Sequence, residues 1–110
     1  MPLIATNKAS QALLKAIRKY GEGIRDFYNS DTSAAELYIV DTEEQWGALG
    51  LDLIVHNLGA APFTVSVDNH VALTIDAGAA FTLQGVVFTR VQVNNAGAIQ
   101  FDIAYAGVKL

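Results

Sequence analysis

The sequence predicts a mainly β protein: an antiparallel β-sandwich or jelly-roll-like domain, preceded by an N-terminal arm and an α-helix. Apolar and polar residues alternate almost without a break from Phe63 to Tyr105, which is the period-two pattern of strands with one buried face. Turn residues interrupt this alternation every 8–12 residues or so, a spacing typical of sandwiches and barrels. We therefore expect about seven strands, joined by short turns.

The expected strands begin with a short β-type run at residues 37–40. An acidic turn at 41–45 and a glycine-spaced connection lead to a strand at 51–57. After a loop, the strand at 63–68 ends in Asp68-Asn69, a pair that suits a tight hairpin turn. The remaining strands are predicted from alternating apolar positions that should face inward: Val71, Leu73 and Ile75, then Phe81 and Leu83, then Val91 and Val93, then Ile99, Phe101, Ile103 and Tyr105.

The first part of the chain predicts a helix. Thr6 or Asn7 can cap it, residues 9–20 are good helix formers without proline, and Gly21 can end it. We expect a helix over about residues 7–20, and a further turn or two over 22–28. Residues 1–33 would then be an arm and helical segment, and residues 34–110 the sandwich domain.

Apolar residues of this helical segment recur at alternating spacings of four and three, as in a heptad seam. The seam could pack against a neighbouring subunit, or the segment could lie on its own sandwich. Two glycines and a length below three heptads favour the second interpretation. Basic residues concentrated in the same segment form either a docking face for an acidic partner or, as we favour, a solvated helix side. The candidate partner-binding residues are Leu13, Ile17, Tyr20, Ile24, Phe27, Lys15, Arg18 and Arg25.

Composition excludes several classes of protein. The net charge of −4 argues against general binding of nucleic acid or anionic membranes. No cysteine is present, and the N-terminus lacks the basic and apolar regions of a signal peptide, so secretion through one is not expected. Only 16% of the residues are charged, against roughly 25% in an average soluble protein. Strands so short of charge are easier to understand if neighbouring subunits cover their edges.

No residue pattern predicts catalysis, a metal or a cofactor. His56 and His70 fall on the polar register or at a turn, and we expect both to be solvated at the surface. They form no spaced ligand set, and no serine lies in a nucleophile motif. The protein is therefore not expected to be an enzyme.

The runs Phe63-Thr-Val-Ser-Val-Asp68, Leu73-Thr-Ile-Asp-Ala-Gly78 and Phe81-Thr-Leu-Gln-Gly85, with the closing residues 104–110, resemble small accessory structural proteins of tailed bacteriophage virions. The resemblance covers about residues 60–110. It implies a structural role, in which the protein binds other subunits and has no catalytic residues or cofactors. The implied partners are the major capsid protein or another virion subunit, and copies of the chain in a symmetric oligomer, a trimer above others. The implied location is the virion, assembled in the host cytoplasm.

Within that family the expected role is capsid decoration: a cement subunit that bridges capsid proteins and stabilises the mature head by mass action. The N-terminal seam would clamp a neighbour, with the sandwich outward. The nearest alternative is a tail, baseplate or fibre-attachment component. A third is a small carbohydrate-binding module with Trp46, Tyr38 or Tyr105 as a stacking platform, although most aromatics fall on inward positions.

Overall fold

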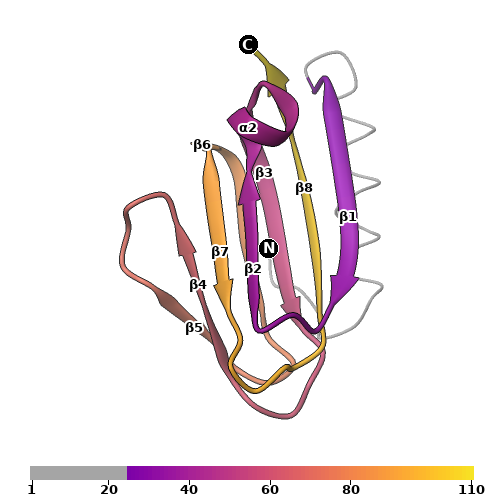
Figure 1. The fold of residues 1–110 in the computed structure, drawn as a ribbon, viewed down its shortest axis with the longest axis vertical. Helices are drawn as coiled ribbons and strands as arrows, with labels where there is room; N and C mark the ends of the chain where they lie inside the picture. The colour runs from indigo at the N-terminus through magenta and orange to yellow at the C-terminus, as the bar shows by residue number, and fades with distance from the viewer. Residues whose placement is uncertain (1–24) are drawn as a thin grey trace.

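Two four-stranded sheets form the protein, in a computed structural model that describes residues 25–110 (Figure 1). Sheet A has the order β1 (Phe27–Ser33), β8 (Phe101–Lys109), β3 (Ala48–Asn57), β6 (Ala80–Phe88). Sheet B has the order β2 (Leu37–Asp41), β7 (Arg90–Asn94), β4 (Phe63–Val67), β5 (Leu73–Ile75). The short helix α2 (Thr42–Trp46) connects β2 to β3.

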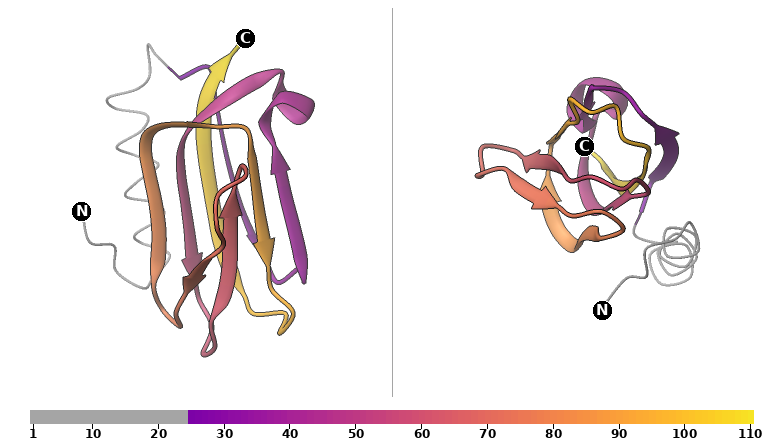
Figure 2. Two further views of the ribbon diagram at one scale, coloured as in Figure 1. Left: turned by 90° about the vertical axis from the view of Figure 1, so that its left-hand side faces the viewer. Right: turned by 90° about the horizontal axis from the view of Figure 1, so that it is seen from below.

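This strand order is that of a jelly roll, in which every neighbouring pair is antiparallel. The predicted antiparallel sandwich is therefore confirmed, with eight described strands instead of about seven. The chain passes between the sheets at one end through α2 and through Thr89, the single residue between β6 and β7. Figure 2 (left) shows this second passage as the arch that joins β6 to β7.

The core lies between the sheets and follows the predicted alternation. Leu53 and Val55 of β3 pack in one cluster with Val65 of β4, and all three are fully buried. Phe101 of β8 makes ring contacts with Tyr38 and Phe63, each at a centroid distance of 5.5 Å. Burial of such side chains contributes about 1.5–3 kcal/mol each, so this cluster is the main source of stability.

The predicted boundary between an arm at 1–33 and a sandwich at 34–110 is wrong, because residues 27–33 are strand β1 and pair with β8. Residues 27 and 28 are accordingly not helical. Phe27 is buried and stacks on Trp46 at 4.9 Å. Further along β1, Asn29 donates a hydrogen bond to the hydroxyl of Tyr105, and Asp31 accepts one from Tyr38. These inward polar residues removed the period-two signal, and the other predictions for residues 1–24 lie outside the described chain.

The acidic stretch predicted as a turn is α2. The Asp41 side chain accepts the Glu44 N–H at 3.0 Å and so caps the first turn. Gly47, with φ of 59°, ends the helix in the left-handed conformation that glycine adopts readily. No helix within residues 25–110 is long and apolar enough to cross a membrane.

Two buried asparagines hold the loops at the opposite end of the sandwich. The Asn57 amide donates to the carbonyls of Ala61 and Ile75. The Asn95 amide donates to the carbonyls of Ala35 and Ile99, and its oxygen accepts the Ile99 N–H. Because each asparagine bonds to a loop and to a distant segment, the turns predicted after residues 57 and 94 are rigidly placed.

Candidate docking surface

The sandwich is open along the side where β5 and β6 are the last strands of their sheets. Figure 2 (left) faces this side, and the turn between β4 and β5 projects from it in Figure 1. A groove with a volume of about 280 Å³ lies there, which we call the β5–β6 groove. Most of its lining is apolar: Val67, Val71, Leu73, Phe81, Leu83, Val86 and Val87, together with Asp68 and His70.

A bulge in β6 produces one wall of the groove. Gly50 of β3 pairs with Phe88, and Asp52 pairs with Gln84, so three residues of β6 lie opposite the single residue Leu51. The first of the three, Gly85, has φ of 68°, which glycine adopts without strain. The next two are Val86 and Val87, which the bulge leaves 49% and 57% exposed.

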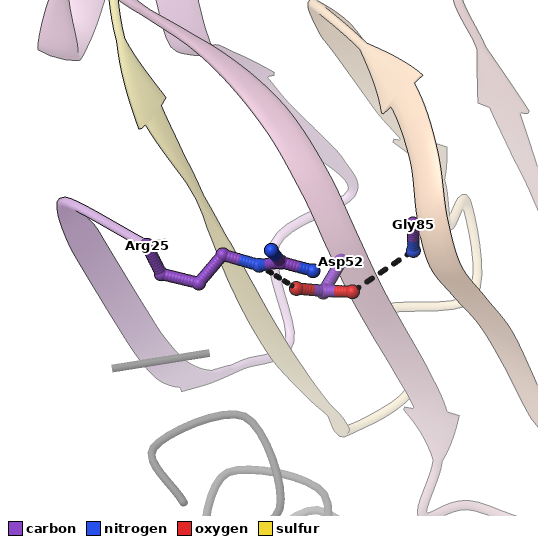
Figure 3. A network of polar contacts seen from close by, with 3 residues as sticks. All are labelled: Arg25, Asp52 and Gly85. Carbon is purple, nitrogen blue, oxygen red and sulfur yellow. Dashed lines mark hydrogen bonds and ion pairs between the residues drawn. The ribbon is translucent and has the colours of Figure 1, made fainter. Parts of the chain in front are cut away.

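The Asp52 carboxylate holds this bulge in place (Figure 3). One oxygen accepts the Gly85 N–H at 3.0 Å, and the other binds Nε of Arg25 at 2.5 Å. Asp52 is only 3% exposed, so its charge is compensated by these two contacts and not by water. The ion pair with Arg25 thus stabilises the carboxylate that fixes the exposed valines.

A second aspartate fixes the other end of the groove. Asp68 follows β4 with φ of 51°, and one carboxylate oxygen accepts the N–H groups of Thr89 and Arg90 and the Thr89 hydroxyl. Burial acts to raise the pKa of Asp68, but these hydrogen bonds outweigh it and hold the pKa below its ordinary value. The β4–β5 turn is therefore tied to the passage between β6 and β7, and Val71 in that turn is 85% exposed.

β6 also has a free backbone edge. It pairs with β3 along one edge, and no strand among residues 25–110 pairs with the other. Residues 80–88 contain no charged side chain and no proline. Edge strands usually carry charged residues or proline, because these prevent pairing with another chain. The part of β6 before the bulge, residues 80–84, therefore has the properties of a strand that another strand can join.

The opposite open side, between β1 and β2, is closed by polar contacts. The Tyr38 hydroxyl on β2 donates to Asp31 on β1 at 2.8 Å and links the two sheets. Burial, followed by the hydrogen bond and the negative charge of Asp31, raises the pKa of Tyr38 strongly, so the phenol stays protonated at neutral pH. The two sides of the sandwich differ, and the β5–β6 side is the one that presents an apolar groove.

Of the predicted partner-binding residues, the structure describes only Arg25 and Phe27, and neither lines this groove. Leu13, Ile17, Tyr20, Ile24, Lys15 and Arg18 lie outside the described residues. The structure corrects the prediction for Phe27, which is buried in the core and unavailable to a partner. Arg25 is held by Asp52.

The groove residues were missed because Val71 and Leu73 were expected to face inward, whereas only Ile75 of that run is buried. A signal for the bulge was present. The adjacent pair Val86-Val87 after a glycine breaks the alternation in the way that bulges do.

The aromatic residues considered for a carbohydrate platform belong to the core. Tyr105 is 3% exposed, and Trp46 and Tyr38 pack against the buried cluster. In the part of the chain that is described, these rings form no exposed row for stacking on a sugar.

The two histidines differ from each other. His70 is exposed in the β4–β5 turn, as expected. The expectation of a solvated His56 is wrong, since it is fully buried on the face of sheet A that points away from sheet B. Neither of its ring nitrogens has a hydrogen-bond partner. Residues 25–110 contain no group of three or more side chains that could hold a metal ion.

Comparison with protein-family models, curated proteins and solved structures finds no match to this chain.

Proposed function

We propose that the protein is a structural subunit that binds other subunits through the β5–β6 groove. More specifically, we propose a capsid decoration (cement) subunit of a tailed bacteriophage virion, which stabilises the mature head by bridging capsid proteins. The observation that carries the proposal is the exposed apolar groove beside a free, uncharged edge strand. The resemblance of residues 60–110 to virion accessory proteins is the reason for proposing a phage virion as the assembly.

The groove offers two kinds of binding energy. Val71, Leu73, Val86 and Val87 are each about half exposed or more, so covering them contributes on the order of 1 kcal/mol per side chain. A strand added along β6 gains backbone hydrogen bonds as well, each worth about 1 kcal/mol net. A contact of this size is weak between two free molecules. It becomes strong where several copies bind one lattice, because their attachments act together.

Stabilisation of the head follows from mass action. A subunit that binds the mature arrangement of capsid proteins, and not the dissociated proteins, shifts the equilibrium toward the intact shell. A surface that binds by shape and apolar contact meets this requirement without a catalytic residue. We propose a closed homo-oligomer, a trimer above others, as the binding unit.

A tail, baseplate or fibre-attachment component would use the same surface, and the particle that it binds distinguishes the two. In the test, the purified protein is incubated separately with mature heads and with tails of the phage whose genome encodes it, and the particles are then sedimented. We expect the protein to sediment with heads and to raise the temperature at which they release DNA. Sedimentation with tails alone would favour the alternative. Binding to neither particle would refute a virion role.

A further inference from the structure

Every second residue of β6 directs its peptide groups away from the rest of sheet A. The N–H of Asn57 on β3 donates to the carbonyl of Ala79 at 2.9 Å, in the same register as the β3–β6 pairs. Hydrogen bonds to one neighbour alternate along an antiparallel strand, so residues 79, 81 and 83 bond to β3. The residues between them point their N–H and carbonyl groups to the edge that no strand within residues 25–110 occupies: Ala80, Thr82 and Gln84.

These outward groups are complementary to those of a second β6. When the second copy is antiparallel and related by a two-fold axis at Thr82, Thr82 lies opposite its own copy and Ala80 lies opposite Gln84. Each outward residue then meets an outward residue, so N–H groups face carbonyls along the whole segment. A shift by one residue would place outward residues opposite those that already bond to β3, so the alternation determines the register.

The side chains fit the same register. Phe81 of each copy lies opposite Leu83 of the other, on the side of the sheet that faces the β5–β6 groove. Both residues line that groove and are only half-buried in the single chain. Apolar pairs across two strands stabilise a sheet, and each pair also covers apolar surface that is partly open to water.

Charge favours this edge as the place where two copies meet. Residues 25–110 contain ten acidic and three basic side chains, so two copies repel each other across much of their surface. Residues 80–84 are uncharged, and no pair in the register brings like charges together. Two acidic copies can therefore associate here without direct repulsion.

We propose that two copies of the chain pair through residues 80–84 of β6, antiparallel and about a two-fold axis at Thr82. The two copies of sheet A, each of four strands, then form one continuous sheet in which neither β6 is an edge. The axis is perpendicular to the joined sheet, because opposed residues share one face, so both β5–β6 grooves lie on the same side.

The pairing goes beyond the proposed function and does not depend on a virion role. It names what occupies the edge of β6, and it presents two grooves side by side to one partner surface. A trimer formed through other surfaces would be joined to a neighbouring trimer by the same contact.

Proline at the centre of the register tests the pairing. Thr82→Pro removes an N–H that points to the free edge and leaves the hydrogen bonds to β3 intact, a position at which edge strands accept proline. Thr82→Val keeps the N–H and is the matched control. In sedimentation equilibrium of the full chain, from micromolar to millimolar concentration, we expect the parent and Thr82→Val to form dimers. Thr82→Pro should associate at least about tenfold more weakly while keeping the circular dichroism spectrum of the parent.

Single cysteines test the register, and they decide the question even if Thr82→Pro does not fold. The chain has no cysteine of its own. Opposed residues of a hydrogen-bonded antiparallel pair have Cα atoms about 5.5 Å apart, which a disulfide can bridge. We expect oxidised Thr82→Cys to give a product of twice the chain mass. Gln84→Cys should give little alone, because it lies opposite Ala80, and should give the product when mixed with Ala80→Cys.

Equal yields from Thr82→Cys alone and Gln84→Cys alone would overturn the register. A monomer at millimolar concentration with no disulfide at position 82 would overturn the pairing. So would an oligomer whose mass Thr82→Pro leaves unchanged and whose Thr82→Cys form gives no disulfide. These measurements use the purified protein alone, so their failure is separate from a failure to bind phage heads.

Discussion

The carboxylate of Asp52 accepts the backbone N–H of Gly85 at 3.0 Å, at the only shift in register recorded between β3 and β6. One buried side chain therefore determines how the edge strand of sheet A bends and which valines it exposes. The same carboxylate binds Arg25, so the start of the described chain and the β5–β6 groove share one anchor.

Replacement of this anchor is expected to destabilise the fold. Asp52→Ala leaves the Gly85 N–H and the Arg25 guanidinium without their acceptor, and we expect the free energy of unfolding to fall by about 2–4 kcal/mol. Urea denaturation measures the change. Arg25→Gln, which leaves the bond to Gly85 intact, should cost less than half as much. Equal losses for the two variants would mean that the ion pair, and not the bulge, is the important contact.

The groove prediction uses two exposed apolar residues of nearly equal exposure. Val87 in the groove is 57% exposed, and Leu37 on β2, away from the groove, is 56% exposed. We expect Val87→Glu to weaken binding to phage heads at least about tenfold, which corresponds to about 1.4 kcal/mol. Leu37→Glu should bind normally, and both variants should unfold within about 0.5 kcal/mol of the parent. Normal binding by Val87→Glu would exclude the groove as the docking surface.

The burial of His56 predicts a stabilising substitution. Its two ring nitrogens are buried without a hydrogen-bond partner, so His56→Leu removes unsatisfied polar atoms from a buried position. We expect the free energy of unfolding to rise by about 1 kcal/mol. Ile54→Ala, a truncation on the same face of β3, should lower it by about 2–5 kcal/mol. If His56→Leu destabilised the protein instead, a polar contact of the imidazole would have to be responsible.

The hydrogen bonds of Asp68 should make the free energy of unfolding depend on pH in the acidic range. Its pKa in the folded protein lies below the ordinary value because hydrogen bonds from Thr89 and Arg90 stabilise the charged form. The contribution is therefore present above a pH of about 4, and it is lost as the pH falls through the lowered pKa of the folded state. Asp68→Asn should be less stable than the parent at neutral pH, and the difference should shrink toward pH 2–3 or so. Asp76→Asn, at an exposed aspartate after β5, is the matched control.

The sandwich could be predicted because most of its strands bury one face. In β4, β7 and β8, an apolar residue at every second position is enough to indicate both strand and inward face. β1 could not be predicted this way, because Asn29 and Asp31 point inward and satisfy Tyr105 and Tyr38. The α2 helix was predictable in principle, since Asp41 followed by Glu44 is a capping pattern.

The groove and the burial of His56 could be found only from the structure. Alternation placed His56 correctly on the side of β3 away from Leu53 and Val55, but a polar register does not reveal whether that side is covered. Val71 and Leu73 continue an apolar pattern that normally indicates burial. Leu73 is exposed because β5 has only three residues and is the last strand of sheet B, at the open side of the sandwich. Val71 is exposed because it lies in the turn before β5.

The position of β8 has a consequence for how the chain folds. β8 spans residues 101–109, yet it lies between β1 and β3 and pairs with both. Sheet A can therefore close only after nearly all of residues 25–110 have been synthesised, and β1 has no partner strand within its sheet until then. Pairings over such long sequence separations slow folding, so we expect refolding in the range of milliseconds to seconds that is typical of non-local β topologies. During that interval the edge of β3 that β8 later joins stays unpaired, in addition to the free edge of the uncharged β6, and chaperones that hold open strands have their longest opportunity to bind.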